Sequence, residues 1–232
     1  MGTVIIPPRD HVESWGISST LAEYPDLRIT PVPGVDAVCI QGELPVAAQK
    51  PGHPLVVDKF RIRIEVPFDF PRSPPLVFEV GGRVPKEFHQ LENGALCLAS
   101  PTRQLLHLHN RHTLLSFIHS FVVPYFYGVV LMERGMSLPF GELAHGRSGL
   151  LADFQQLFRT DNSEAAIAFV GLTARPKRKA NHCMCPCGSG VRLSRCQVHH
   201  AHVIGLRKTL GRRWFKYQHE ALTRGTAKQI LR

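Results

Sequence analysis

The sequence lacks any run of about 18 uncharged apolar residues, the length that crosses a membrane as a helix. Its first ten residues, which include Pro7, Pro8, Arg9 and Asp10, also lack the apolar core of a signal peptide. We therefore expect a cytoplasmic protein without a membrane span. A phosphate-binding loop of the form Gly-x-x-x-x-Gly-Lys-Ser/Thr is missing as well.

Acidic residues are scarce in the C-terminal quarter of the chain. Residues 171–232 contain 14 Lys and Arg against Glu220 alone, whereas residues 1–170 contain 14 Lys and Arg against 17 Asp and Glu. The formal net charge of +10 therefore comes from the C-terminal part. This shift in composition predicts a main domain, a basic linker and a small module, over residues 1–171, 172–182 and 183–232.

Cysteine is sparse except in one short segment, since four of the six cysteines fall within residues 183–196. In a cytoplasmic chain this crowding argues against disulfides and for a bound metal ion. Cys185, Cys187 and Cys196 are spaced so that their thiolates can hold tetrahedral Zn²⁺, and Gly188 and Gly190 permit a tight turn.

The segment that begins Cys185-Pro-Cys-Gly-Ser-Gly190 resembles the SEC-C zinc motif, which ends in Cys followed directly by Cys or His. Gln197 stands in that last place, so another side chain must supply the fourth ligand. We favour His199, with Cys183 and His200 as the alternatives. Because no carboxylate or base for an open site accompanies the motif, we expect the zinc to be structural.

A second pattern precedes Cys97. Residues 60–66 alternate apolar and charged side chains, as a half-buried strand does. Three prolines within residues 71–75 then force a turn before residues 76–80 resume as a strand. Cys97 follows this strand in the segment Asn93-Gly-Ala-Leu-Cys-Leu98.

The wider pattern predicts an α+β domain, in which a helix near residues 10–23 precedes an antiparallel sheet. Apolar residues at helical spacing from Thr113 onward predict a helix beneath the sheet, which Pro124 would end or kink. The expected strands lie near residues 26–32, 36–45, 57–67 and 75–80, and the later helices near 149–159, 162–171 and 203–221.

These elements resemble the ubiquitin-conjugating-enzyme (UBC) fold, in which an aromatic, proline-rich corner and a histidine precede Gly-x-x-Cys-Leu. Phe68-Asp-Phe-Pro71, His89 and Gly94-Ala-Leu-Cys-Leu98 match those elements. The resemblance implies an N-terminal helix, a four-stranded antiparallel sheet and C-terminal helices. The same resemblance implies that Cys97 is a nucleophile that forms a thioester.

The chain departs from the family's His-Pro-Asn motif, because Gln90 and Leu91 stand in place of its Pro and Asn. Asn93 is a candidate substitute for stabilising the oxyanion. His89 either fixes the loop or acts as acid and base, and we favour the structural role.

This chain also resembles bacterial relatives of the UBC family in a segment that follows Cys97. These relatives include proteins of antiphage operons with cyclic-oligonucleotide signalling (CBASS). They share a Gly-Glu-x-x-His-Gly-x-x-Gly-Leu segment, which includes His145 here. His145 either faces the thioester cleft or belongs to a helix-capping turn.

A cysteine thiolate suits acyl transfer because it is strongly nucleophilic and because a thioester keeps the acyl group reactive. The acceptor would be an amine. Since the chain lacks a phosphate loop, a separate activating enzyme would supply the energy. The resemblance to the antiphage group implies the C-terminus of a nucleotide cyclase as the protein cargo.

Two other functions stay open. An isolated cysteine is often a buried apolar residue, and loss of the Asn-bearing motif fits a catalytically inactive UBC-fold adaptor. The basic helix near residues 203–221 could instead engage nucleic acid through its charged face, although we favour a solvated or protein-docking face.

Overall fold

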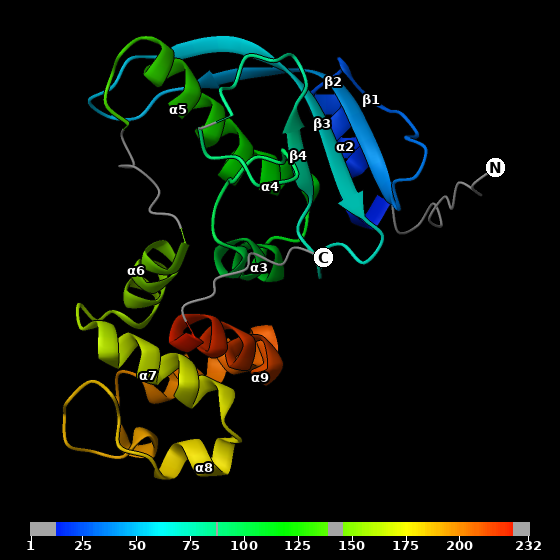
Figure 1. Ribbon diagram of the computed structural model, residues 1–232. Coiled ribbons are helices and arrows are strands. Elements are labelled where there is room, and N and C mark those ends of the chain that lie inside the picture. Colours follow the sequence, from blue (N-terminus) through cyan, green and yellow to red (C-terminus); the bar gives the residue numbers. More distant parts are fainter. Residues whose placement is uncertain (1–12, 87, 139–145, 225–232) are drawn as a thin grey trace. The chain divides into compact units, whose positions relative to one another are not determined.

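The computed structural model describes residues 13–86, 88–138 and 146–224 (Figure 1). The chain divides into two compact units, Met1–Glu142 and Leu143–Arg232, which we call unit 1 and unit 2.

Unit 1 is an α+β domain whose sheet has four antiparallel strands in the order β1-β2-β3-β4, which confirms the coarse fold prediction. Each strand pairs with its neighbour in the sequence, as a meander does. A helix precedes the sheet and a series of helical segments follows it. Their bounds are α2 (Ile17–Glu23), β1 (Leu27–Ile29), β2 (Ala37–Ala48), β3 (Val56–Pro67), β4 (Leu76–Glu79), α3 (Pro101–Asn110), α4 (Leu114–Phe117), the π-helix η1 (Ile118–Val122) and α5 (Val123–Glu133).

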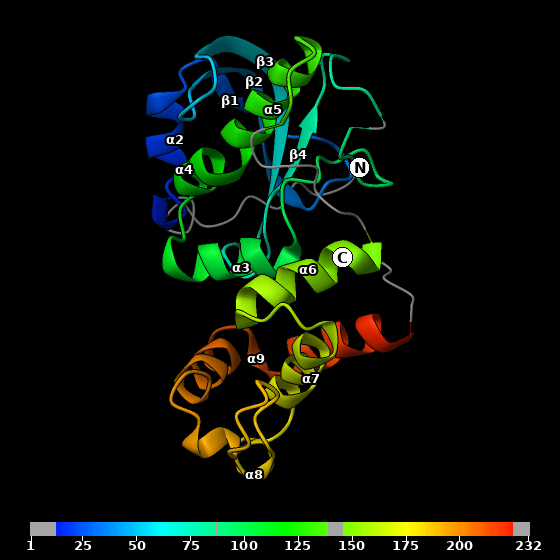
Figure 2. The ribbon, with the colours of Figure 1, turned by 90° about the vertical axis from the view of Figure 1, so that its left-hand side faces the viewer.

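The core of unit 1 lies between the sheet and the helices α4 and α5, which cover one face of the sheet (Figure 2). The apolar residues that alternate along β3 all point into this core and are at most 2% exposed. Phe60 of β3 stacks on Phe126 of α5 with ring centroids 4.1 Å apart. The two-residue period of the sequence therefore fixes which face of the sheet the helices cover.

The helix expected from Thr113 begins there, because the Thr113 hydroxyl accepts the N–H of Ser116 as an N-cap. Pro124 neither ends the helix nor breaks it. The π-helix Ile118–Val122 ends two residues before Pro124, which lacks an N–H and cannot continue a regular α-helical ladder.

Leu114–Glu133 forms a helical stretch of 20 residues with a mean hydropathy of 1.8, long and apolar enough to cross a membrane by length and composition. Such a stretch differs from the expectation that the chain lacks an apolar run of this length. In the structure 61% of it is buried inside the fold. Core helices of water-soluble proteins pass the same test, so the stretch is weak evidence for a membrane span.

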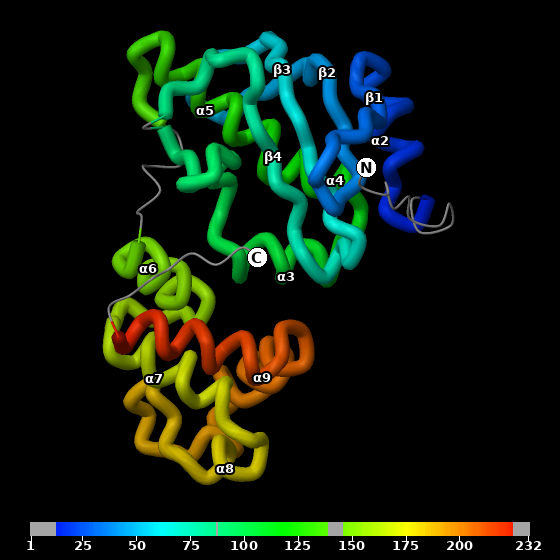
Figure 3. The backbone as a smooth tube through the Cα atoms, turned by 45° about the vertical axis from the view of Figure 1, so that its right-hand side comes forward, coloured from blue at the N-terminus to red at the C-terminus, as the bar shows by residue number. Residues whose placement is uncertain are grey.

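Unit 2 is built of helices joined by loops. Its elements are α6 (Gly146–Phe158), α7 (Ser163–Ala174), α8 (Lys177–His182), the 3₁₀-helix η2 (Leu193–Arg195) and α9 (His200–Arg224). Helices α7 and α9 lie side by side (Figure 3). They approach closely at Gly171, where an added Cβ would lie 2.8 Å from the His219 ring nitrogen Nε2.

The division between the units differs from the predicted one. We expected the main domain to extend to residue 171 and a linker to cover residues 172–182, but the first unit ends at Glu142. Helix α7 is apolar nearly all round and packs against α9 of unit 2. Part of the expected linker forms α8, in which Ala180 is fully buried. The basic composition reflects exposed side chains on folded helices.

Helix α9 contains a bend that its sequence pattern does not predict. Gly211 has φ 78° and ψ 158°, so two helical segments meet there. The apolar residues of both segments face inward, and Val203 and Phe215 are fully buried. The expected amphipathic helix is therefore present, but it is bent, and a residue with a Cβ would be strained at the bend.

Candidate functional site

Cys97 lies in a loop pinned to the sheet by main-chain hydrogen bonds; residues 88–98 are the Cys97 loop. The Leu96 N–H donates to the Val77 carbonyl of β4 (2.7 Å), and the Cys97 N–H donates to the His89 carbonyl (2.6 Å). Gln90 and Leu96 form an isolated antiparallel bridge. The backbone at Cys97 therefore has a defined position beside β4.

The Cys97 side chain is partly exposed between buried neighbours. Leu96 is 5% exposed and Leu98 is 8% exposed, so both anchor the loop in the core while the thiol between them reaches the surface. Partial burial raises the pKa of the Cys97 thiol above its ordinary value. The group is therefore mainly a neutral thiol near pH 7, and a nucleophilic role requires a base or a bound partner to ionise it.

Asn93 is exposed, and its side-chain oxygen Oδ1 accepts the N–H of Ala95 at 3.0 Å. This bond closes a local turn together with the Gly94 N–H, which donates to the Leu91 carbonyl at 2.8 Å. The oxygen of Asn93 thus stabilises the loop.

His89 shapes the Cys97 loop through its main chain. Its φ of 45° lies in the left-handed region, and its carbonyl receives the Cys97 N–H. The ring lies edge-on to Phe88 with centroids 4.9 Å apart. The two roles considered for the His89 side chain, fixing the loop and acting as acid and base, stay predictions.

Tyr125 of α5 is a residue that sequence reasoning missed. Its hydroxyl donates to the Phe88 carbonyl at 2.9 Å, and its ring packs against the Phe88 ring with centroids 5.6 Å apart. Burial raises the pKa of Tyr125, and the nearby Cys97 and Glu79 raise it further. The hydroxyl also lies 3.5 Å from the His89 carbonyl, which accepts the Cys97 N–H, so α5 brings Tyr125 to the Cys97 loop. No local motif marks Tyr125, because the contact joins residues far apart in the sequence.

His145, the other candidate for the thioester cleft, lies outside the described residues.

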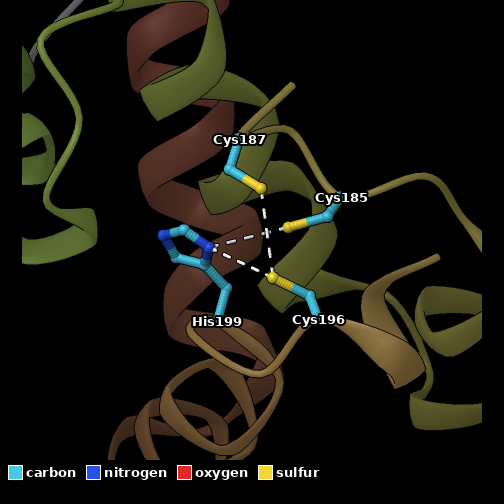
Figure 4. Close-up of side chains that lie close together, drawn as sticks. All are labelled: Cys185, Cys187, Cys196 and His199. Atoms are coloured by element: carbon cyan, nitrogen blue, oxygen red, sulfur yellow. Dashed lines mark hydrogen bonds between the residues drawn. The ribbon is translucent and has the colours of Figure 1, made fainter. Parts of the chain in front are cut away.

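Four side chains of unit 2 converge on a common point, as Figure 4 shows. Their ligand atoms all lie within 4.8 Å of one another. The Sγ atoms of Cys187 and Cys196 are 3.9 Å apart. The Nδ1 atom of His199 lies 3.7 Å from the Sγ of Cys185 and 3.5 Å from the Sγ of Cys196. This group, which could hold a metal ion, we call the Cys/His centre.

The local sequence explains how the Cys/His centre forms. Gly188 and Gly190 adopt φ values of 77° and 70°, which let the chain turn tightly after Cys187. Cys196 ends η2, and His199 lies three residues later, just before α9. The loop therefore presents the cysteines, and the start of α9 presents the histidine.

His199 is oriented by a second contact. Its Nδ1 faces the sulfur atoms, and its Nε2 lies 3.2 Å from the Phe158 carbonyl at the end of α6. This geometry fits a tautomer in which Nε2 carries the proton and Nδ1 is the ligand atom. A histidine that binds a metal commonly donates its other N–H to such a carbonyl.

The two alternative ligands lie outside the Cys/His centre. The Sγ of Cys183 accepts a hydrogen bond from Arg175 at 3.2 Å and lies 3.3 Å from the Lys179 carbonyl. His200 is not among the four converging residues.

All six cysteines lie in the described part of the chain, and all are free thiols, as expected from their distribution.

Comparison of the chain with protein-family models gives no match, and comparison with curated proteins gives none either.

Proposed function

We propose that the protein is a ubiquitin-conjugating-like acyl carrier of the bacterial antiphage (CBASS) type, in which Cys97 forms a thioester with a protein C-terminus. The observation that carries the proposal is the Cys97 loop, which follows β4 and holds a partly exposed thiol between two buried leucines. The helix, antiparallel meander and later helices of unit 1 also occur in the order that the UBC resemblance implies.

In the first step the Cys97 sulfur attacks the carbonyl carbon of an activated C-terminus. A C–S bond forms, the C–O bond to the activating group breaks, and the thiol proton passes to a base or to water. In the second step an amine nitrogen attacks the thioester. A C–N bond forms, the C–S bond breaks, and Cys97 recovers a proton.

Each attack creates an oxyanion that needs a hydrogen-bond donor. The side-chain amide of Asn93 supports this role because the Asn93 oxygen is already engaged within the loop. Tyr125 acts as a positioning residue, since its hydroxyl holds the Phe88 carbonyl beside His89. His89 supports the reaction by receiving the Cys97 N–H.

We propose Zn²⁺ for the Cys/His centre. Tetrahedral zinc with Zn–S bonds of about 2.3 Å and Zn–N bonds of about 2.0–2.1 Å places sulfur atoms about 3.8 Å apart and sulfur about 3.6 Å from nitrogen. The sulfur atoms of Cys187 and Cys196 lie 3.9 Å apart, and the Nδ1 atom of His199 lies 3.5 and 3.7 Å from the sulfur atoms of Cys196 and Cys185. Bound zinc would supply a structural crosslink, since four protein ligands complete its coordination.

The proposed function needs two partners, an activating enzyme and a protein cargo. A C-terminal carboxylate needs activation, and the chain lacks a phosphate loop, so a separate activating enzyme would prepare the cargo. The resemblance to the antiphage group supports a nucleotide cyclase as the cargo and the cytoplasm as the compartment.

A second candidate is a catalytically inactive UBC-fold adaptor. One observation favours it specifically: burial raises the pKa of Cys97, which reduces the thiolate that acyl transfer needs. The two functions differ in whether a covalent adduct forms on Cys97.

Intact-mass spectrometry tests the proposal on the full chain expressed with the products of its neighbouring genes. We expect an adduct on the wild type that a thiol reductant removes. Cys97→Ala should lack the adduct, and Cys97→Ser should carry a reductant-resistant oxyester of the same acyl mass.

Cys183→Ala is the matched control, because Cys183 is also a half-buried thiol outside the Cys/His centre. It should keep the adduct. Absence of any adduct from the folded, metal-loaded wild type would favour the adaptor.

A further inference from the structure

Basic side chains gather around the C-terminal end of α7 in unit 2. The Leu172 and Thr173 carbonyls accept hydrogen bonds from Arg207 at 3.1 and 3.0 Å. The Ala174 carbonyl accepts one from Arg212 at 3.1 Å. Arg175 follows directly, and α8 begins two residues later. We call these residues the basic surface: Arg175, Lys177, Arg178, Lys179, Arg207 and Arg212.

The charge of this surface is not balanced by carboxylates. Unit 2 contains 16 Lys and Arg against four Asp and Glu. Within the described residues, no ion pair joins any of the six basic side chains to a carboxylate. Burial and the neighbouring Arg212 both lower the pKa of Arg207, so positive charges repel one another here.

The α7 carbonyls offset part of the charge of Arg207 and Arg212, because a helix C-terminus carries partial negative charge. They do not engage the charges of α8. Lys177, Arg178 and Lys179 are all exposed on this short helix. The fold thus holds two guanidinium groups in place and leaves the adjacent charges free for an anionic partner.

The packing of α9 argues against a membrane surface as that partner. A membrane-binding amphipathic helix inserts its apolar face between lipids. The apolar face of α9 is already used, since Val203, Leu206 and Phe215 are at most 7% exposed. Only the charged face remains available.

The aromatic residues of α9 argue against a single-stranded ligand, which proteins bind by stacking bases on exposed rings. Phe215 is fully buried and Trp214 is half-buried. Tyr217 is the most exposed aromatic ring of the described α9, at 37%. One partly exposed ring does not form the series of stacking surfaces that a single strand needs. A duplex instead offers closely spaced phosphates without requiring any stacking.

We propose that the basic surface binds duplex nucleic acid through its phosphates, without base-specific contacts. This activity is separate from the acyl transfer assigned to Cys97. It would bring the conjugating unit to duplex DNA or RNA, because the two units belong to one chain.

Fluorescence anisotropy of the full chain with labelled 20-base-pair DNA and RNA duplexes tests the proposal. We expect binding in 50 mM salt that weakens with added salt and does not depend on base sequence. A charge-reversed α8 variant, Lys177→Glu, Arg178→Glu and Lys179→Glu, should bind at least tenfold more weakly. Its slope of log affinity against log salt should fall by about two to three, because each lost phosphate contact removes about 0.9.

A variant of unit 1, Arg28→Glu, Arg72→Glu and Lys86→Glu, is the matched control, since it changes the net charge equally at exposed positions. It should keep its affinity within threefold. Equal losses in the two variants, or no duplex binding by the wild type in 50 mM salt, would overturn the proposal.

Two further arms identify the kind of ligand. Phosphatidylserine vesicles and polyglutamate should bind at least tenfold more weakly than duplexes at equal charge concentration, and comparable binding of either would refute a nucleic-acid site.

If the charge-reversed variant misfolds, Lys177→Gln with Lys179→Gln replaces it, with an expected loss of threefold or more. Cys97→Ala should bind duplexes normally, so this result is independent of the thioester experiment.

Discussion

Unit 1 and unit 2 achieve a folded state in different ways. Unit 1 has a nearly balanced charge, with 12 Lys and Arg against 14 Asp and Glu, and a core built between a sheet and its covering helices. Unit 2 has a large excess of positive charge, fewer residues and the Cys/His centre, which could hold a metal ion. Unit 1 is therefore held by apolar burial, and we propose that a bound metal ion adds a crosslink to the apolar packing of unit 2.

Loss of the Cys/His centre should have the largest effect and should separate the units. We expect Cys196→Ala, or removal of the metal by a chelator, to unfold unit 2 and leave unit 1 folded. Structural zinc contributes roughly 10–16 kcal/mol of apparent binding free energy at pH 7. Hydrogen exchange should show rapid exchange of α7 and α9 amides and continued protection of β2 and β3.

Cys183→Ala is the control for that experiment, since Cys183 lies outside the group of four. Its exchange pattern should match the wild type. Simultaneous unfolding of both units in Cys196→Ala would contradict the comparison.

The helix contact at Gly171 gives the next largest effect. Gly171→Ala places a Cβ 2.8 Å from the His219 ring and should lower the free energy of unfolding of unit 2 by about 1–3 kcal/mol. Gly205→Ala, on α9, has nothing within 4 Å of its new Cβ and should raise that free energy by up to about 1 kcal/mol. Urea titrations that gave the two variants the same sign would show that the close packing of α7 on α9 is unimportant.

A matched pair of tyrosines in unit 1 tests the positioning of the Cys97 loop. Tyr125→Phe removes the hydrogen bond to the Phe88 carbonyl, and Tyr127→Phe removes one to the Pro54 carbonyl. Both should lower the free energy of unfolding of unit 1 by about 0.5–1.5 kcal/mol. Only Tyr125→Phe should also change the rate of Cys97 alkylation by iodoacetamide, and equal alkylation rates in both variants would remove Tyr125 from the site.

The smallest expected effect is on the pH dependence of the rate at which Cys97 is alkylated. Because burial raises its folded-state pKa, the alkylation rate should still rise above pH 8.5, where an unfolded cysteine begins to level off at about its ordinary pKa. The raised pKa adds stability that is present below the unfolded pKa and is lost as pH rises through the folded pKa. A plateau below pH 8 would mean that the thiol is activated in the free protein.

The strands and the Cys/His centre were predictable because their signals are local. Alternation along residues 60–66 marks β3, and the spacing of Cys185, Cys187 and Cys196 brings those side chains together once two glycines turn the chain. His199 was favoured among the candidates for the fourth position, and it lies in the group.

The boundary between the units was not predictable in the same way. Helix α7 is apolar nearly all round, so its sequence shows that it is buried but not which core it joins. The charge and proline of the basic segment before the cysteines are typical of an exposed linker, but the buried Ala180 fixes this segment in place as α8.

Two helical features depend on signals that periodicity does not capture. Helix α3, which the residue pattern did not predict, begins with Ser100 as its N-cap and Pro101 as its first residue, and its buried residues include the polar Thr102 and Gln104. The contact of Tyr125 with Phe88 joins two elements 37 residues apart in the sequence. Such contacts depend on the assembled fold.

The contacts of α6 with the start of α9 set an order in which the chain can fold during synthesis. The Phe158 carbonyl faces His199, and the Leu157 carbonyl faces His202 at 2.8 Å, so α6 is completed by residues made about 40 positions later. At roughly 5–20 residues per second, several seconds separate their appearance. We therefore expect unit 1 to fold while the ribosome is still synthesising unit 2. Within unit 2, α6 and α7 should stay accessible to chaperones until α9 has been made.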